Sequence, residues 1–434
     1  MKTAWNVTSN MKVVYDISVL GCGHYQPTAR TGVFRVVENI ARGLAASKEC
    51  DLTFCSSLSL EALNQTIDYL KSTDWGEDIP FLSTGRSKDL HKELSKIVTI
   101  INKEEQVSLL MKISRRVLLY GIRLIEANFS PLSRKALLGK DIFHSPYFAL
   151  PEESKNVNRL KRVLTVYDLI PILYSQFFEL NSKGFYEILN SLTPRDWVIC
   201  ISQATKNDLC NYRTDLDAGR VFVTQLAASE LFYRCEDFSE IASVRKKYQI
   251  PDSPYILSLS TLEPRKNIAH TIRCFAKTVQ QENLKDLHLV LVGTKGWDYN
   301  EIFEEISKYE DIKKRIIITG YVADEDLAAL YSGALAFVYP SFYEGFGLPP
   351  LEAMQCGVPV ITSNTSSLPE VVGDAGITVA PTDADALCHS MVEIYNKPSL
   401  REAMSLKSID RAKQFSWEKC TQETFAAYKT ALSE

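Results

Sequence analysis

Two glutamates, Glu344 and Glu352, stand with seven residues between them in a glycine- and proline-rich segment that covers residues 341–354. Glu352 is expected in the first turn of a helix, where a carboxylate can accept hydrogen bonds from two vicinal hydroxyls, such as those of a ribose. A carboxylate on the loop before that helix can reach a second polyhydroxylated group. The alternative is structural, because acidic side chains in such places also stabilise a helix dipole.

The glycines and prolines of this segment favour the ligand-binding interpretation. Gly345 and Gly347 let the backbone approach a ligand, because no Cβ atom stands in the way. Pro349 and Pro350 suit a first helical turn, where no amide hydrogen is needed. The free amides and the positive dipole end of such a helix would face a phosphate. The contacts on this loop are expected from Gly345, Phe346, Gly347 and Leu348.

Short apolar runs alternate with helical patterns along the chain, and this rhythm restarts after the Pro-Asp-Ser-Pro sequence at 251–254. Nearly continuous apolar strands separated by helices are typical of parallel sheets covered on both faces. We therefore predict an α/β fold with two doubly wound domains, at 11–235 and 250–415, and a helix at 416–434 that packs back on the first domain. Ligands of such sheets bind beyond the carboxyl ends of the strands. The expected site is thus the cleft between the domains. The predicted strands are 12–17, 52–54, 142–144, 163–166, 198–201, 255–259, 287–292, 315–319, 335–339 and 358–362.

The 341–354 segment resembles the signature of glycosyltransferase family 4, which contains retaining enzymes of the GT-B fold, with two Rossmann-like domains. Other segments match this family in the same order, so the resemblance covers nearly the whole chain. Residues 259–267 look like its phosphate-binding loop and 292–297 like the next strand and loop. Residues 320–322, followed by Leu327 and Tyr331, look like its base-contacting segment. Residues 30–40 resemble its Gly-loop. The segments 141–146 and 165–171 resemble two loops near the sugar and the acceptor.

This resemblance implies a role for each matching residue. Glu344 would hold the donor sugar, Glu352 the ribose, and Arg265 with Lys266 the diphosphate. Asp168 is the expected polar contact near the reacting groups. The other expected donor contacts are Gly32, Arg35, Thr261, Gly293, Tyr321 and Val322. Tyr167 and His144 are expected on the acceptor side, although a histidine at a strand end is as often a packed core residue.

The function implied is retaining transfer of a hexose or similar sugar from a GDP-, UDP- or dTDP-sugar to an acceptor hydroxyl. The acceptor would be a glycan or a lipid-linked glycan, in polysaccharide, O-antigen or glycolipid assembly. The sequence offers no convincing protein nucleophile, in agreement with a mechanism in which the departing phosphate removes the acceptor proton. Two alternatives stay open: a nucleotide-sugar epimerase, which would need no acceptor, and a non-catalytic partner subunit.

Three positions depart from the family pattern. Ser260 stands near a position where many relatives have arginine, so Arg265 would have to supply the second positive charge. Phe34 replaces the second glycine of the Gly-loop, and we expect it to narrow the approach of the phosphates. Tyr167 stands where many relatives have histidine, and its hydroxyl has a different reach.

No metal and no cofactor are expected, because cations and backbone amides can stabilise the leaving diphosphate. Three Asp-x-Asp triplets, at 215–217, 324–326 and 383–385, are interpreted as structural. Each stands in a turn or before a helix, where aspartate is a good capping residue.

Composition limits the partners. The formal net charge of −4 argues against a nucleic-acid-binding protein, which would usually be basic. Ten scattered cysteines and the lack of a signal-like apolar segment favour a reducing cytoplasm. Residues 107–125 combine apolar and basic side chains at helical spacing. Such a helix can lie on the inner face of a membrane or simply pack on its own domain with its basic face in water.

Overall fold

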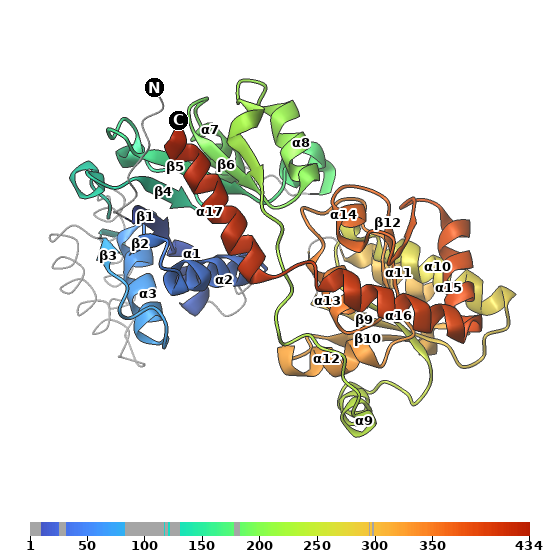
Figure 1. Cartoon of the computed structure of the whole chain (residues 1–434). Coiled ribbons are helices and arrows are strands. Elements are labelled where there is room, and N and C mark those ends of the chain that lie inside the picture. Colours follow the sequence, from blue (N-terminus) through green and yellow to red (C-terminus); the bar gives the residue numbers. More distant parts are fainter. Residues whose placement is uncertain are drawn as a thin grey trace.

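The computed structural model describes residues 10–25, 32–82, 131–177, 183–294 and 299–434, together with residues 117, 120, 121 and 296. These residues form two lobes that lie side by side, each built on one sheet (Figure 1). All of the strand pairs are parallel, so the predicted α/β class with two doubly wound sheets is confirmed. The domain boundaries proposed from the sequence stay predictions.

The first lobe has a seven-stranded sheet in the order β3-β2-β1-β4-β5-β6-β7. Its strands are β1 (Met11–Asp16), β2 (Cys50–Cys55), β3 (Phe81–Leu82), β4 (Ile142–Ser145), β5 (Lys161–Val166), β6 (Trp197–Cys200) and β7 (Val221–Val223). Its described helices are α1 (Ser18–Tyr25), α2 (Gly32–Ala46), α3 (Leu60–Lys71), α6 (Ile170–Leu173), α7 (Lys183–Asn190) and α8 (Gln203–Tyr212).

The second lobe has a six-stranded sheet in the order β10-β9-β8-β11-β12-β13. Its strands are β8 (Tyr255–Leu259), β9 (His288–Val292), β10 (Ile316–Gly320), β11 (Ala336–Tyr339), β12 (Val360–Ser363) and β13 (Ile377–Val379). Its helices are α9 (Phe238–Lys247), α10 (Ile268–Gln281), α11 (Asn300–Ser307), α12 (Asp324–Ser332), α13 (Leu348–Gln355), α14 (Leu368–Val372), α15 (Ala384–Asn396) and α16 (Pro398–Ala412).

The strand order in each sheet reverses once, and this reversal fixes where a ligand can bind. In the second lobe the chain runs outward in one direction from β8 to β10 and then returns to place β11 on the other side of β8. The loops that follow β8 and β11 therefore diverge and leave a crevice at the carboxyl edge of the sheet. Both strands are apolar and almost wholly buried, so they form a rigid base for these loops.

Strands β3, β7 and β13 were absent from the sequence prediction. Each has only two or three residues and lies at an edge of its sheet. An edge strand is paired on one side only, so it needs no long apolar run, and its sequence pattern is weak. The central strands carry the strong pattern because both of their faces are covered.

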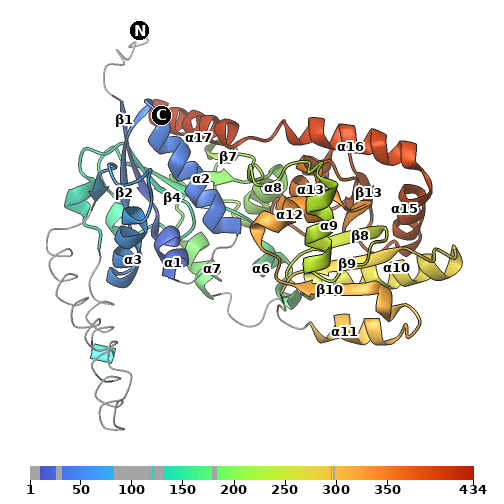
Figure 2. The ribbon, with the colours of Figure 1, turned by 90° about the horizontal axis from the view of Figure 1, so that it is seen from below.

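The C-terminal helix α17 (Trp417–Ser433) returns from the second lobe to the first and lies along α2 (Figures 1 and 2). Ser416 caps its start by accepting a hydrogen bond from the backbone N–H of Lys419. Its contact with α2 is close, because a Cβ atom added to Gly43 would stand 2.1 Å from the Thr421 hydroxyl. The chain thus crosses between the lobes twice, once before α9 and once before α17.

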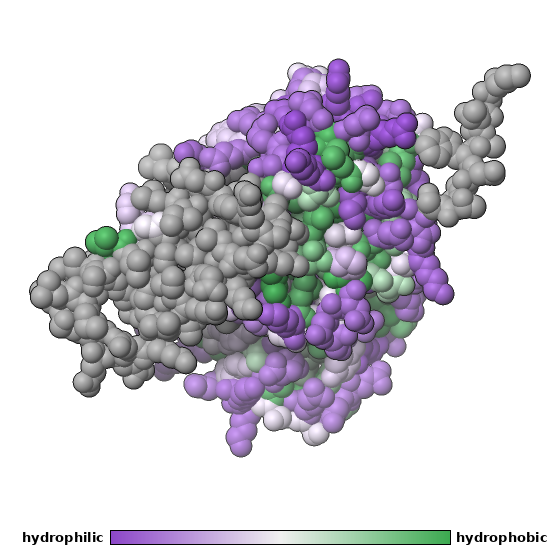
Figure 3. Space-filling view, turned by 90° about the vertical axis from the view of Figure 1, so that its left-hand side faces the viewer, coloured by the Kyte–Doolittle hydropathy of each residue, from purple (hydrophilic) through white to green (hydrophobic). Residues whose placement is uncertain are grey.

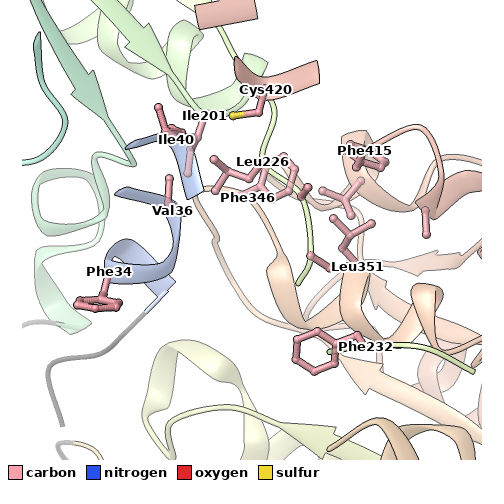
Figure 4. Close-up of a cluster of buried hydrophobic side chains, with 14 of the residues drawn as sticks. Phe34, Val36, Ile40, Ile201, Leu226, Phe232, Phe346, Leu351, Phe415 and Cys420 are labelled. Atoms are coloured by element: carbon pink, nitrogen blue, oxygen red, sulfur yellow. The ribbon is translucent and has the colours of Figure 1, made fainter. Parts of the chain in front are cut away.

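A continuous apolar cluster joins the lobes at this crossing (Figure 4). Phe346, from the loop before α13, lies beside Leu226 of the first crossing and contacts the ring of Phe415. Ile201 and Cys420 close the cluster on the first-lobe side. Because Phe346 belongs to the predicted ligand loop, the apolar contact between the lobes also holds that loop in place.

His144 is a core residue in this structure. It is fully buried at the end of β4, where its Nδ1 lies 2.6 Å from the Tyr428 hydroxyl of α17 and its Nε2 lies 2.8 Å from the Thr165 hydroxyl. Burial lowers the pKa of His144 to about 3. Both ring nitrogens are occupied, so the expected acceptor-side role of His144 is corrected in favour of the packed-core alternative.

Replacing Tyr428 with phenylalanine is expected to destabilise the fold by about 1–3 kcal/mol, because it leaves a buried imidazole nitrogen without a partner. Urea unfolding would measure the change, and Tyr212→Phe at an exposed tyrosine is the matched control. An unchanged unfolding midpoint for Tyr428→Phe would mean that this hydrogen bond contributes nothing to holding α17 on the first lobe.

In the part of the chain that the structure describes, no helix has the length and apolarity needed to cross a bilayer. The basic segment 107–125 lies outside the described residues except at positions 117, 120 and 121, so its membrane role stays a prediction. Figure 3 looks at the outer face of the first lobe, where apolar and polar side chains are interspersed beside the grey atoms.

Candidate functional site

The crevice of the second sheet opens towards the first lobe and forms a cavity of about 600 Å³. Its second-lobe wall consists of the loops after β8, β9, β10 and β11 and the starts of α12 and α13. Its first-lobe wall consists of the start of α2 and the loop after β5. Every site residue predicted from the sequence, with the exception of His144, lines this cavity. The structure therefore brings together side chains that are as far as 320 positions apart, from Gly32 to Glu352.

Glu344 is held by two cations. The ammonium of Lys266 donates hydrogen bonds to Glu344 Oε1 at 2.7 Å and to the Tyr339 hydroxyl at 2.6 Å. Arg265 Nη1 lies 3.0 Å from Glu344 Oε2. Burial disfavours the charged form of Glu344, but Arg265 and Lys266 outweigh it and lower the pKa of Glu344 to about 2. Glu344 is therefore a carboxylate at neutral pH.

Arg265 is shared between two carboxylates. Its Nη2 donates to Glu263 Oε1 at 2.6 Å, and its Nη1 donates to the carbonyl of Tyr343 at 2.6 Å. Two cations and two carboxylates thus balance each other in a buried cluster. A diphosphate that enters here must draw Lys266 away from Glu344 or share the cation with it. Ser260, whose buried hydroxyl has no hydrogen-bond partner in the described structure, adds no charge to this wall.

Glu352 lies one turn deeper in its helix than the sequence suggested. Helix α13 begins at Leu348, so Glu352 is the fifth residue and not part of the first turn. The Tyr331 hydroxyl donates a hydrogen bond to Glu352 Oε2 at 3.1 Å. Burial raises the pKa of Glu352 to about 7, although Arg35 and the Tyr331 hydrogen bond act in the opposite direction. This carboxyl therefore changes its charge close to neutral pH.

Gly345 allows close contact between the two lobes, in addition to any approach of a ligand. A Cβ atom at this position would stand 2.4 Å from the carbonyl oxygen of Tyr167. Gly293 meets a similar limit, because its φ is +147° and a Cβ atom would stand 1.8 Å from the Ser260 carbonyl oxygen. Alanine at Gly345 would force the two lobes apart, whereas alanine at Gly293 would separate two loops of the second lobe, those after β8 and β9.

The start of α2 meets the second lobe directly. Arg35 donates to Asp324 of α12 at 2.6 Å, and a Cβ atom on Gly32 would stand 3.5 Å from the Leu348 side chain. The expectation that Phe34 narrows this approach is wrong. Its ring packs inside the first lobe against Gly23 and edge-on to Tyr69, and in Figure 4 it lies apart from the residues at the cleft.

Tyr167 and Asp168 stand where the first-lobe wall comes nearest to Glu344. Asp168 Oδ1 accepts the backbone N–H of Ile170 at 3.0 Å, which fixes the turn after β5. Burial raises the pKa of Asp168, against the opposing effects of that hydrogen bond and of Arg265. The Tyr167 hydroxyl is buried and has no hydrogen-bond partner among the described residues.

Helix α8 makes hydrogen bonds to both walls of the cleft. The Thr205 hydroxyl lies 3.0 Å from the Tyr167 carbonyl oxygen and 3.3 Å from that of Gly345. The Glu370 carboxylate accepts the first backbone N–H groups of α8, at 2.8 and 2.7 Å. One turn further along α8, Asp208 accepts a hydrogen bond from the Tyr343 hydroxyl. This role of α8 was not predictable from the sequence, because the helix is more than 130 positions from the loop it contacts.

A second cavity, of about 740 Å³, lies in the first lobe and joins the cleft at Val33, Tyr167 and Asp168. Its other walls come from the loops after β2 and β4 and from α7. Most of the lining is apolar or aromatic. It includes the rings of Tyr147, Phe148 and Phe185.

The three Asp-x-Asp triplets have structural partners. Asp215 pairs with Arg213, Asp324 with Arg35, and Asp383 caps α15 through the Ala386 N–H. Among the described residues, no group of three or more histidine, cysteine, aspartate and glutamate side chains is arranged to hold a metal ion. Independence from metals stays a prediction.

Three side chains of the site were not singled out as site residues from the sequence: Tyr339, Tyr331 and Glu263. Tyr339 is the last residue of β11, so a hydroxyl-bearing side chain at the carboxyl end of a buried strand was an available signal. Glu263 stands two residues before Arg265 in a loop with two adjacent cations. That pattern was an available signal for an ion pair. Tyr331 was noted only as part of a family segment.

Comparison with known proteins gives consistent matches. The family profile described as "Glycosyl transferases group 1" matches residues 240–411. The chain is 38% identical over 294 residues to the O-antigen chain mannosyltransferase B of Escherichia coli, and the match covers 66% of this chain and 74% of that protein. It is 31% identical to the serotype-specific mannosyltransferase WbdA of Escherichia coli, but it spans only 34% of that protein's length.

Among solved structures, sucrose-phosphate synthase from Thermosynechococcus elongatus superposes with a TM-score of 0.64 at 18% identity. The match covers 98% of this chain and 100% of that one. At this identity the likeness shows the fold alone, which is two Rossmann-like lobes with a cleft between them.

Proposed function

This chain belongs to the group 1 glycosyltransferases, and on that premise we propose that it transfers a mannosyl group from a nucleoside diphosphate to an acceptor hydroxyl. The choice of mannose rests on the two named relatives, both of which are mannosyltransferases. We propose retention of the anomeric configuration, no metal requirement, and a role in polysaccharide, O-antigen or glycolipid assembly. We also propose that the protein acts in the cytoplasm, with 107–125 as a candidate contact with the inner membrane face.

One observation carries this proposal: Glu344, Lys266 and Glu352 line a single cleft beside a second cavity that opens onto it. The carboxylate of Glu352 suits the ribose hydroxyls, and that of Glu344 suits hydroxyls of the sugar. The Lys266 ammonium contacts Glu344 and lines the same cleft, where it can stabilise the negative charge of a leaving diphosphate. An epimerase needs no acceptor space, so the adjoining cavity favours transfer.

In the mechanism that we propose, the donor diphosphate draws the Lys266 ammonium from Glu344 as it binds. The bond between the anomeric carbon and the phosphate oxygen breaks, and its electron pair goes to the leaving diphosphate. The acceptor oxygen attacks the same face of the sugar, and its proton passes to the departing phosphate oxygen. Lys266 and Arg265 stabilise the charge that grows on this phosphate. The close walls exclude water, which would otherwise hydrolyse the donor.

The test is a screen of GDP-, UDP- and dTDP-linked mannose and glucose with a panel of mannose-containing acceptors. We expect a glycoside product from one mannose donor, with the donor's anomeric configuration retained, as read by NMR from the one-bond carbon–proton coupling at the anomeric carbon of the product. Conversion of the donor to an epimer without an acceptor, or an inverted product, would contradict the proposal.

Thr205→Val is expected to lower kcat for transfer by about tenfold, because the hydroxyl that joins the Tyr167 and Gly345 carbonyls is lost and the reacting groups lose register. The affinity for the donor should change much less than kcat, because Thr205 reaches the donor-binding loop through the Gly345 carbonyl and not through a side chain placed against the donor. Thr205→Ser keeps the hydroxyl and should restore turnover. If Thr205→Val and Thr205→Ser turn over alike, the hydroxyl does not position the site.

A further inference from the structure

The first-lobe cavity is large enough for a second substrate, and it opens into the cleft. Its volume of about 740 Å³ lies within the usual range for small-molecule sites. It shares Val33, Tyr167 and Asp168 with the cleft, so a molecule seated in it can present an atom to the reacting centre. The inference that follows rests on the proposed transferase function and concerns the chemistry of the acceptor.

The charge of the lining discriminates between classes of acceptor. The ionisable carboxyls that line the cavity are those of Asp168 and Glu187, and no lysine or arginine is among its described lining residues. A phosphate placed here would meet these carboxylates and no cation among the described lining residues. Sugar hydroxyls, in contrast, can donate hydrogen bonds to carboxylate oxygens.

The aromatic walls give the second criterion. Tyr147 packs edge-on against Phe148, with ring centroids 5.1 Å apart, and against Tyr167 at 6.0 Å. Tyr147 remains 37% exposed, and Phe185 of α7, which also lines the cavity, is partly exposed. Aromatic rings offer large rigid apolar surfaces. A pyranose carries C–H groups on one face of its ring, and these pack on such surfaces while the hydroxyls at its rim reach polar groups.

We propose that this cavity binds the terminal residue of an uncharged saccharide, stacked on Tyr147 or Phe185, with the acceptor hydroxyl directed past Asp168 into the cleft. Any phosphate that links the acceptor to a carrier then lies outside the cavity. The enzyme accordingly extends a neutral glycan end and does not glycosylate a sugar phosphate directly.

Saturation-transfer NMR on the full chain tests this proposal without the need for turnover. The probes are methyl α-mannopyranoside and mannose 6-phosphate, each measured against the wild type in the absence of donor. We expect saturation of the ring C–H protons of the methyl glycoside and affinity about tenfold weaker for mannose 6-phosphate. Equal or tighter binding of the phosphate overturns the proposal.

Two variants place the binding in this cavity. Phe185→Ala should weaken the methyl glycoside about tenfold, whereas Phe238→Ala, at an exposed phenylalanine of the second lobe, should leave it unchanged. Glu187→Lys, at an exposed position, should shift the preference towards mannose 6-phosphate, since it puts a cation beside the cavity. If neither Phe185→Ala nor Glu187→Lys alters binding, the saccharide binds elsewhere and the proposal fails.

Failure of this inference is distinguishable from failure of the transferase function. Binding of a nucleoside diphosphate to the second-lobe cleft is measured separately and does not depend on Phe185 or Glu187. A chain that binds the nucleotide and prefers the sugar phosphate is still a transferase, but with a charged acceptor.

Discussion

Lys266→Ala is expected to reduce kcat by about 10²–10³-fold, the range seen when one preorganised donor to a developing negative charge is removed. Lys266 is the ammonium that touches Glu344 and Tyr339 and that we place against the leaving phosphate. Its effect should be largest at the transition state, where the diphosphate gains charge, so the donor Kd should rise much less than kcat falls. Steady-state kinetics combined with donor titration separates the two effects.

The matched control is Lys277→Ala, one helix away, where the lysine pairs with exposed Asp385 at the surface. This variant should keep full activity, because exposed ion pairs contribute little. The thermal midpoint of Lys266→Ala is a second control, since Glu344 keeps Arg265 as its partner and should stay charged. A kcat for Lys266→Ala close to that of Lys277→Ala would remove Lys266 from the mechanism.

Glu352→Ala is expected to weaken donor binding by about 100-fold, because two hydrogen bonds from ribose hydroxyls to a carboxylate are lost together. The reduced affinity should appear equally for the nucleotide sugar and the free nucleoside diphosphate, since both carry the ribose. Titration calorimetry of both ligands measures it. An effect confined to the nucleotide sugar would assign Glu352 to the sugar instead.

The same carboxyl predicts a pH dependence of binding. Burial raises the pKa of Glu352 to about 7, so its carboxylate form is lost as the pH falls below that value. A protonated carboxyl accepts fewer hydrogen bonds. The donor Kd should therefore rise as the pH falls below 7, up to about the 100-fold loss expected for Glu352→Ala, and become constant above about pH 8. Glu352→Gln carries no titrating group and should show a flat profile, and a slope that persists in this variant would assign the titration to another group.

Much of the fold follows from the sequence for a physical reason. The central strands are buried on both faces, so β8 is predicted residue for residue and β11 to within one residue. The structure of the segment around Glu344 and Glu352 can also be predicted, because glycine and proline mark the turn and the start of the helix. The sequence could not predict which residues far apart in the chain contact one another. Arg35 with Asp324, Thr205 with Gly345, and His144 with Tyr428 are pairs set by the contact of the two lobes.

Two predictions about the site, those for Phe34 and His144, were wrong for the same physical reason. Phe34 was expected to narrow the approach of the phosphates, and His144 was expected on the acceptor side, because their segments resemble family loops that lie at the cleft. A helix or a strand turns successive side chains to different sides. Phe34 therefore points into the first lobe while Arg35 reaches the cleft, and His144 points to α17.

The central claim is that one cleft binds a nucleoside diphosphate through Glu352 and the Lys266–Glu344 pair. Its most direct test is calorimetric titration of GDP, UDP and dTDP into the wild type and into Glu352→Ala. The claim predicts that one nucleotide binds the wild type at a single site, with a Kd between about 1 μM and 1 mM, and that Glu352→Ala loses most of this affinity. Absence of binding by all three nucleotides, or undiminished binding to Glu352→Ala, would contradict it.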